Sequence, residues 1–362
     1  MSSKLLQDVE RALVSTTLPE MGDLALSQVC LAQEHEGRVR IQVNQGVHGE
    51  DITDRLRAAV TQAVASLGSE RIDLGFSVAV LPAKSLQSAS VSSVPGVKNI
   101  IAIASGKGGV GKSTTAVNIA LALAHEGAKV GILDADIYGP SQPQMLGVAD
   151  KRPEMYGPNM IEPIKAHGVH VVSMGNLVTD STPMVWRGPM VSGALQQLLQ
   201  NTHWVEIDYL VIDMPPGTGD IQLTLSQAVP VSGSVIVTTP QDIALLDARK
   251  GIEMFRKVHI PVLGVVENMA THICLNCGHA EDIFGAHGGE ALAAEYSVGL
   301  LGRLPLTKVV REQTDAGKPP VVADPNSELS REYRSIANSV ALTLWLQSLS
   351  GNSGPEISFA DD

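Results

Sequence analysis

Short runs of consecutive apolar residues alternate with segments of helical periodicity between residue 99 and about residue 345. Each run is suited to a strand buried on both faces, as strands of parallel sheets are. The predicted strands cover 99–104, 129–133, 209–212, 234–238, 262–266 and 300–302, and the predicted helices cover 114–126, 242–258 and 327–348. This alternation predicts an α/β domain with a mainly parallel sheet and helices on both faces.

The first 82 residues have a different pattern, which predicts a small α+β domain. Its expected elements are a helix over 4–13, a half-buried strand over 38–43, a helix over 51–67 and a strand over 76–81. Residues 83–98 are rich in serine and lack apolar periodicity, which is typical of a linker. We therefore expect domains at 1–82 and 99–348, with a flexible tail at 349–362.

Composition excludes several classes of protein. No apolar run approaches the roughly 18 residues of a membrane span, and the N-terminus lacks the features of a secretory signal or transit peptide. The three cysteines, Cys30, Cys274 and Cys277, are too few for a disulfide framework. We expect a cytoplasmic protein that binds no membrane, and the formal net charge of −12 argues against nucleic acid as a partner.

One glycine-rich stretch predicts a nucleotide site. Gly106-Lys107-Gly108-Gly109-Val110-Gly111-Lys112-Ser113 fits the pattern G-x-x-x-x-G-K-[ST] and joins a predicted strand to a predicted helix that starts at Thr114. Such a loop points backbone N–H groups at phosphates, aided by the helix N-terminus. Lys112 is expected to reach the β- and γ-phosphates, and the Ser113 hydroxyl to join the Mg²⁺ shell.

Carboxylates follow two further strands. Asp134 and Asp136 come after one predicted strand, and Asp213 comes directly after another. The carboxyl ends of parallel strands meet at one sheet edge, where ligands bind. Each aspartate alone is also compatible with a turn or a helix cap. Beside a phosphate loop, Asp213 has the Walker B form and is expected to hold Mg²⁺ through water, and Asp136 to position the attacking water.

Cys274-x-x-Cys277 follows the strand at 262–266. Two thiols at this spacing can share a metal or form a redox pair, although the context is unlike that of a thioredoxin motif. A [4Fe–4S] cluster needs four thiolates, which a two-fold dimer would supply by bringing two pairs together. A structural zinc site, completed within one chain by two of His272, His279 and His287, is an equal alternative on these residues alone.

The lysine that follows the first glycine of the loop makes Gly106–Ser113 resemble the deviant Walker A motif of the ParA/MinD/ArsA class of ATPases. In that class, this lysine reaches the phosphates of a partner subunit across a nucleotide-sandwich dimer. The resemblance implies this role for Lys107, and it implies a homodimer.

Further stretches resemble the Mrp/ApbC family of iron–sulfur carrier ATPases. They cover residues 95 to about 345, in the segments 134–141, 186–190, 213–220, 239–242, 267–269 and 274–278. The resemblance implies that Asp136 lies in switch I, that Asp213 lies in Walker B and switch II, and that Asn268 recognises adenine.

The N-terminal domain resembles the MIP18 family in outline. The cysteine that members of that family often carry before the second helix has no counterpart in residues 45–50, and Cys30 lies elsewhere, in an expected core strand. We therefore expect Cys30 to be a buried thiol, and we assign this domain no chemistry.

The expected function is transfer of iron–sulfur clusters to apoproteins by a homodimer that binds and slowly hydrolyses ATP, with a [4Fe–4S] cluster held by Cys274 and Cys277 of both subunits. One alternative is a ParA/MinD-type positioning ATPase. MinD-like proteins end in a basic amphipathic helix, whereas residues 351–362 are acidic and contain glycine and proline. Another is a zinc-stabilised ATPase of unknown client.

Overall fold

The structure is a computed structural model that describes residues 4–83, 93–176, 188–217, 219–274 and 276–350. The chain divides into two compact units. Unit 1 comprises Met1–Lys84 together with Ala341–Asp362, and unit 2 comprises Ser85–Val340. Within the described ranges, no helix combines the length and the apolar character that crossing a membrane requires.

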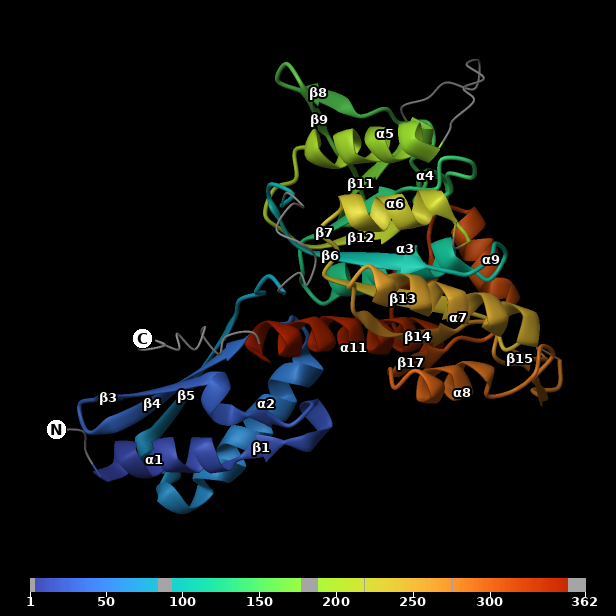
Figure 1. The fold of residues 1–362 in the computed structure, drawn as a ribbon. Coiled ribbons are helices and arrows are strands. Elements are labelled where there is room, and N and C mark those ends of the chain that lie inside the picture. The colour runs from blue at the N-terminus through green and yellow to red at the C-terminus, as the bar shows by residue number, and fades with distance from the viewer. Residues whose placement is uncertain (1–3, 84–92, 177–187, 218, 275, 351–362) are drawn as a thin grey trace, which may run out of the picture. The chain divides into compact units, whose positions relative to one another are not determined.

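Unit 2 is built on an eight-stranded sheet (Figure 1). Only the outermost pair, β10 and β11, is antiparallel, and the other neighbours in the sheet are parallel. The strands, in order across the sheet, are β10 (Ile164–Ala166), β11 (Val169–Ser173), β7 (Val130–Asp134), β12 (Ile207–Asp213), β6 (Val97–Ala104), β13 (Gly233–Thr238), β14 (Val262–Glu267) and β17 (Leu300–Arg303). The central residues of β7, β12, β6, β13 and β14 are buried, as expected for continuous apolar runs between two helical layers, whereas Lys165 in β10 is exposed and β17 is only partly buried.

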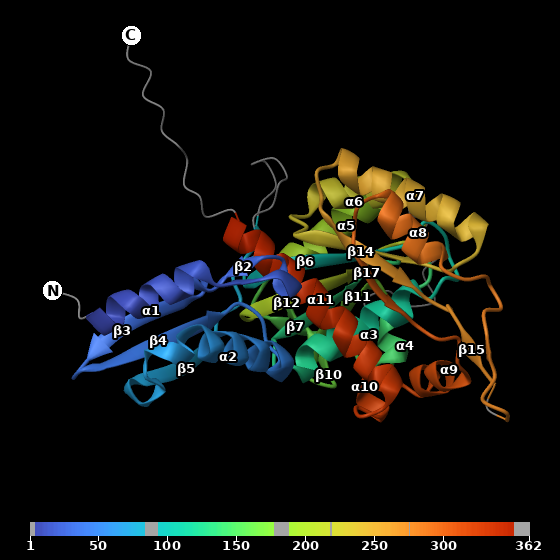
Figure 2. The same cartoon turned by 90° about the horizontal axis from the view of Figure 1, so that it is seen from below.

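Helices cover both faces of this sheet, which confirms the predicted α/β architecture (Figures 1 and 2). One layer contains α5 (Gly188–Gln200), α6 (Asp220–Ala228), α7 (Asp242–Lys257) and α8 (Gly288–Glu295). The other side carries α3 (Lys112–His125), α4 (Gln142–Met145), α9 (Lys308–Asp315), α10 (Pro320–Ala323) and the first part of α11 (Glu328–Ser350). Two small hairpins lie outside the sheet, β8 (Glu154–Tyr156) with β9 (Met160–Glu162), and β15 (His272–Ile273) with β16 (Ala280–Glu281).

Unit 1 contains a three-stranded sheet packed against two helices. Its elements are α1 (Lys4–Ser15), the short strands β1 (Thr17–Leu18) and β2 (Leu24–Ala25), then β3 (Cys30–His35), β4 (Arg38–Gln45), α2 (Glu50–Val64) and β5 (Ile72–Val78). The alternation in β4 buries Val39, Ile41 and Val43 completely, while the residues between them face the other side of the sheet. This is the small α+β domain that the first 82 residues predict.

The end of α11 belongs to unit 1, whereas the sequence assigns the helix through residue 348 to the second domain. Leu344 and Trp345 are buried there, 1% and 3% exposed. A Cβ atom on Gly46 would lie 2.0 Å from Cδ1 of Trp345, so glycine is needed for this close approach. The two units therefore share one continuous helix, which the helical periodicity alone does not reveal.

Candidate functional site

The phosphate loop runs from the end of β6 to the start of α3. Gly111 occupies the N-cap position of α3 with a φ of 84°, a left-handed conformation that favours glycine. A Cβ atom at Gly111 would also lie 2.1 Å from Nδ2 of Asn268. That amide donates a hydrogen bond to the carbonyl oxygen of Val110 at 2.8 Å, so Asn268 lies directly against the loop.

Two contacts fix the start of the loop. A Cβ atom on Gly106 would lie 2.2 Å from the backbone C and O atoms of Asp247 in α7, so the loop touches that helix. The Ser105 hydroxyl donates to the carbonyl oxygen of Lys107 at 2.8 Å, and the Gly217 N–H donates to the carbonyl oxygen of Ser105 at 3.0 Å. The segment after Asp213 is therefore hydrogen-bonded to the residue that precedes the loop, which is consistent with the pairing of β12 and β6.

Lys112 and Asp213 form a buried ion pair at the centre of this edge. The Lys112 ammonium donates to Oδ1 of Asp213 and also lies 3.2 Å from the Ser113 hydroxyl oxygen. The lysine side chain is 6% exposed and the aspartate is fully buried. The ion pair brings together the lysine expected to contact phosphate and the carboxylate expected to hold Mg²⁺.

Asp134 anchors the loop that carries Asp136. Its buried carboxylate accepts hydrogen bonds from the N–H groups of Asp136, Ser141 and Gln142 and from the Ser173 hydroxyl, at 3.0 to 3.2 Å. Burial, together with the nearby Asp213 carboxylate, raises the pKa of Asp134 to about 7. Burial likewise raises the pKa of Asp136, although Lys112 lowers it in part.

The residues present fit a magnesium ion. Mg²⁺ prefers hard oxygen ligands and keeps several waters. The Ser113 hydroxyl and the Asp213 carboxylate supply such oxygens, and the buried Oε1 of Gln142 beside them has no hydrogen-bond partner among the described residues. When bound with nucleotide, the ion would neutralise phosphate charge.

The cysteine pair lies at the end of the β15–β16 hairpin. Cys274 is half-buried and Cys277 is exposed. The Cys274 N–H donates to the carbonyl oxygen of His279 at 2.9 Å, and the Gly278 N–H donates to the carbonyl oxygen of Cys274 at 2.8 Å. Hydrogen bonds from the N–H groups of Asn276 and Cys277 lower the pKa of the Cys274 thiol, which favours the thiolate that a metal requires.

Histidines do not complete a metal site at this hairpin. Among the residues that the structure describes, no three Cys, His, Asp or Glu side chains are grouped so that they could hold a metal. Nδ1 of His272 lies 3.1 Å from the carbonyl oxygen of Leu306, and Nδ1 of His287 lies 2.9 Å from Glu290. One chain therefore offers two thiols and no third ligand within its described part.

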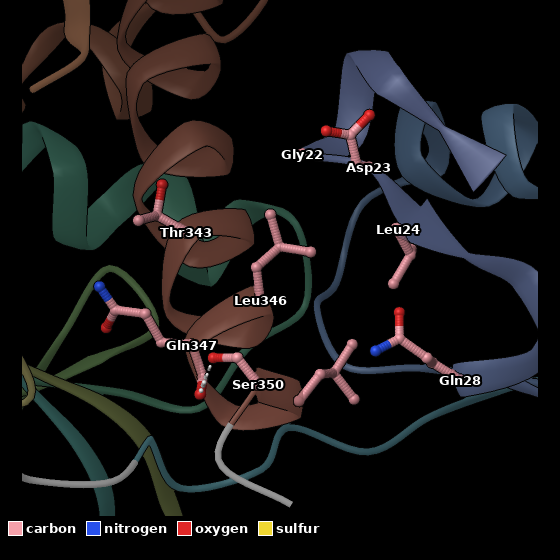
Figure 3. A pocket seen from close by; sticks show the side chains of 9 residues that line it. Gly22, Asp23, Leu24, Gln28, Thr343, Leu346, Gln347 and Ser350 are labelled. Carbon is pink, nitrogen blue, oxygen red and sulfur yellow. Dashed lines mark hydrogen bonds between the residues drawn. The ribbon is translucent and has the colours of Figure 1, made fainter. Parts of the chain in front are cut away.

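Unit 1 contains an open pocket of about 360 Å³ (Figure 3). It is lined by Gly22, Asp23, Leu24 and Gln28 and by Thr343, Leu346, Gln347, Leu349 and Ser350 at the end of α11. Among these described lining residues none is a lysine, arginine, histidine or cysteine. The pocket therefore offers no basic side chain to a phosphate and no thiol or imidazole to a metal cluster, and the candidate site remains the sheet edge of unit 2.

The structure brings together most residues that the sequence predicts for the nucleotide site. The contacts described above link the loop to Asp213 through Lys112 and to Asn268 through Val110 and Gly111. Thr114 follows in the first turn of α3, and Asp136 lies on a loop fixed to the same edge. Sequence reasoning missed Gln142, which no motif marks, and it placed Asp134 at this sheet edge without giving it a role. Some residues of the stretches that carry the family resemblance lie outside the described residues, namely Trp186, Arg187, Thr218 and Leu275.

Comparison with known proteins gives consistent matches over unit 2. Residues 96–341 match the ParA family described as NUBPL iron-transfer P-loop NTPases. The chain is 67% identical over 250 residues to an iron–sulfur cluster carrier protein of Pseudomonas fragi, a match that covers 69% of this chain and 87% of the relative. It is 62% identical to the carrier protein of Escherichia coli K12, over 70% of this chain and 69% of that protein. It is 51% identical to the mouse iron–sulfur cluster transfer protein NUBPL, over 69% of this chain and 79% of that protein.

Solved structures agree on the fold. A nucleotide-binding protein from Archaeoglobus fulgidus in complex with ADP is 35% identical, with a TM-score of 0.57, and the match covers 65% of this chain and 91% of that one. The cell-division ATPase MinD from Pyrococcus furiosus is 24% identical, with a TM-score of 0.51 over 67% of this chain and 98% of that one. The second likeness concerns the fold alone.

Proposed function

This chain belongs to the NUBPL-type family of iron-transfer P-loop NTPases, and from that membership we propose that it carries iron–sulfur clusters and delivers them to apoproteins. Relatives that share up to 67% of the matched residues are named as carriers or transfer proteins of such clusters. Family membership over most of unit 2 favours this function over the MinD-type positioning role, because the likeness to MinD extends only to the fold.

One observation carries the assignment to a site, namely the paired thiols of Cys274 and Cys277 on an exposed hairpin. Cluster transfer requires ligands that a client can reach and replace, and Cys277 is exposed. The lowered pKa of Cys274 favours ligation at neutral pH. We propose that these two cysteines hold the cluster that is the cargo of this protein.

The same pair supports a homodimer. A [4Fe–4S] cluster takes four thiolates, whereas the hairpin offers two, so two copies related by a two-fold axis would complete the set. Large apolar side chains are exposed on segments that follow the carboxyl ends of the strands, at Tyr138, Ile243, Leu246, Ile273 and Ile283, each 51% to 69% exposed. Exposed apolar groups near the carboxyl ends of the strands of unit 2 suit an interface with a second copy of the chain.

ATP binding and hydrolysis are proposed for the loop at 106–114. Lys112 would exchange Asp213 for the phosphates, and the released carboxylate would be available to a Mg²⁺-bound water, with Ser113 as a direct ligand of the ion. Asp136 is proposed to position the attacking water, Lys107 to contact the partner's phosphates, and Asn268 to contact adenine beside the loop. The resemblance to ParA/MinD-class ATPases implies the slow turnover of a switch. In such a switch, nucleotide biases the interface by binding its alternative arrangements unequally.

Zinc in place of the cluster is the second candidate. It needs two further ligands from the same chain, and among the described residues no group of three Cys, His, Asp or Glu side chains is placed to hold a metal. Exposed thiolate ligands also suit a reducing compartment, so we propose the cytosol as the location.

Anaerobic reconstitution with iron and sulfide tests the function. The expected product has the broad visible absorbance of a cluster and restores an Fe–S-dependent apoenzyme on mixing. A protein that retains stoichiometric zinc and takes up no iron would contradict the proposal.

A further inference from the structure

Gln142 lies between the two halves of the nucleotide site. It is the first residue of α4 and is fully buried. Its Nε2 donates to Oδ2 of Asp213 at 2.9 Å and to the carbonyl oxygen of Ser113 at 3.0 Å. One amide group therefore joins the Walker B carboxylate to the first turn of α3.

The neighbours of this amide fix which way it points. The Asp213 carboxylate and the Ser113 carbonyl oxygen only accept hydrogen bonds, so the NH₂ end of Gln142 must face them. Its Oε1 is then directed away from both, and this oxygen is buried without a hydrogen-bond partner among the described residues. A buried polar oxygen is rarely left without a hydrogen-bond partner, so a water molecule or a ligand atom is expected to donate to Oε1.

The backbone of Gln142 connects the same point to the loop that carries Asp136. Its N–H donates to Oδ2 of Asp134 at 3.1 Å, beside the N–H of Ser141 at 3.0 Å. Gln142 is therefore fixed through its backbone at Asp134 and through its side chain at Asp213 and Ser113. Its side chain cannot turn away without breaking bonds to both the Walker B strand and the phosphate loop.

We propose that Gln142 is a positioning residue for the divalent cation that accompanies the nucleotide. Nε2 holds Asp213 in place when Lys112 leaves it for phosphate, and Oε1 accepts a hydrogen bond from a water molecule of the cation's shell. This rests on the proposed binding of ATP at the loop. The new element is that Gln142, a residue outside the recognised motifs, contributes to the affinity for the metal.

The test measures nucleotide binding by fluorescence of a labelled ADP, in EDTA and in a titration with MgCl₂. Gln142→Met and Gln142→Leu remove both polar atoms of the side-chain amide at similar volume. Either variant is suitable for the test if its circular dichroism spectrum shows that it is folded. Groups that orient metal ligands typically contribute 10- to 100-fold to metal affinity, so we expect the Mg²⁺ concentration for half-maximal enhancement to rise about tenfold. Affinity in EDTA should change by less than about twofold.

Gln144→Leu is the matched control. Gln144 lies on the same short helix, is exposed, and its Nε2 donates a hydrogen bond to the carbonyl oxygen of Asp315 at 3.4 Å. This variant should bind nucleotide with wild-type dependence on Mg²⁺. A wild-type Mg²⁺ dependence in the Gln142 variants, or an equal loss of affinity with and without Mg²⁺, would overturn the proposal. Failure of the wild-type protein to bind nucleotide would instead contradict the proposed function.

Discussion

Lys112 donates a hydrogen bond to Asp213, and both side chains are buried, at 6% and 0% exposure. The lysine that is proposed to contact phosphate is thus held by the carboxylate that is proposed to serve the metal. Two buried charges are tolerable because they are paired, and each would be costly alone. In the proposed mode of binding, nucleotide and metal together replace this pair, so we expect their binding to be linked.

Loss of one partner of this pair is predicted to destabilise unit 2. Lys112→Met leaves the Asp213 carboxylate buried with the Gln142 amide as its remaining described polar partner, and breaking a buried pair in this way typically costs about 3 to 5 kcal/mol. The double variant Lys112→Met/Asp213→Leu removes both charges and should regain most of that stability. Urea unfolding followed by circular dichroism measures both effects.

The exposed pair of Lys129 with Glu206, whose side chains are 56% and 72% exposed, supplies the control. Lys129→Met should unfold at nearly the wild-type urea concentration, because solvent screens exposed charges. If Lys112→Met is as stable as Lys129→Met, the buried pair does not stabilise the fold as described.

Gly106 and Gly108 should differ in their tolerance of a methyl group. A Cβ atom on Gly106 would lie 2.2 Å from the backbone of Asp247, whereas a Cβ atom on Gly108 would meet only Cβ of Pro216 at 4.0 Å. Overpacking of this kind typically costs about 1 to 3 kcal/mol. Gly106→Ala should therefore melt at a lower temperature than the wild type, and Gly108→Ala should not. Equal melting temperatures would contradict the contact between the loop and α7.

The three cysteines are predicted to differ in reactivity. Cys30 is half-buried on β3, whose other residues are mostly exposed, so the expectation of a fully buried thiol in a core strand is wrong. Desolvation nevertheless raises the pKa of Cys30 to about 12, so at pH 8 its thiolate fraction is lower by roughly three orders of magnitude than that of an ordinary thiol. Iodoacetamide should modify Cys274 and Cys277 in the metal-free protein and spare Cys30, as measured by peptide mass spectrometry. The Cys30 rate should keep rising with pH up to about 12, because only the thiolate reacts. Rapid labelling of Cys30 at pH 8 would show that it is not shielded.

Substitutions of Lys107 and Lys112 should affect dimerisation and nucleotide binding separately. Lys107→Ala is expected to abolish ATP-dependent dimerisation, measured by light scattering after size-exclusion chromatography, while the monomer still binds ATP. Lys112→Ala should lose nucleotide binding itself, since Lys112 is proposed to contact the phosphates in its own subunit. Lys151→Ala, at an exposed position, should behave like the wild type. A Lys107→Ala protein that dimerises normally with ATP would remove the proposed contact across the interface.

Strong local signals made much of unit 2 predictable. Consecutive residues are enough to predict the apolar strands β6, β7, β12, β13 and β14 and the loop before α3. Strands β10 and β11 were missed because Lys165, His167 and His170 interrupt the apolar pattern at the sheet margin. The division of α11 between two units depends on tertiary contacts, such as Trp345 with Gly46, that periodicity does not encode.

The candidate site likewise contains residues that the sequence predicts and residues that only the structure reveals. Glycines and charged residues at fixed spacing indicate a phosphate loop, because backbone geometry alone creates that site. Gln142 carries no such signal, since its importance arises only when α4 brings its amide to Asp213 and Ser113. The family resemblance likewise pointed to the cysteine pair more sharply than the spacing, which suits zinc and iron equally.

The most direct test of the account is anaerobic native mass spectrometry of the reconstituted protein. We expect the mass of one [4Fe–4S] cluster, about four iron atoms, on dimer ions and none on monomer ions. Dimers that contain the Cys274→Ala/Cys277→Ala chain should carry no cluster, whereas Cys30→Ala should match the wild type. A cluster or a zinc ion bound stoichiometrically to the monomer would contradict a cluster shared between two subunits.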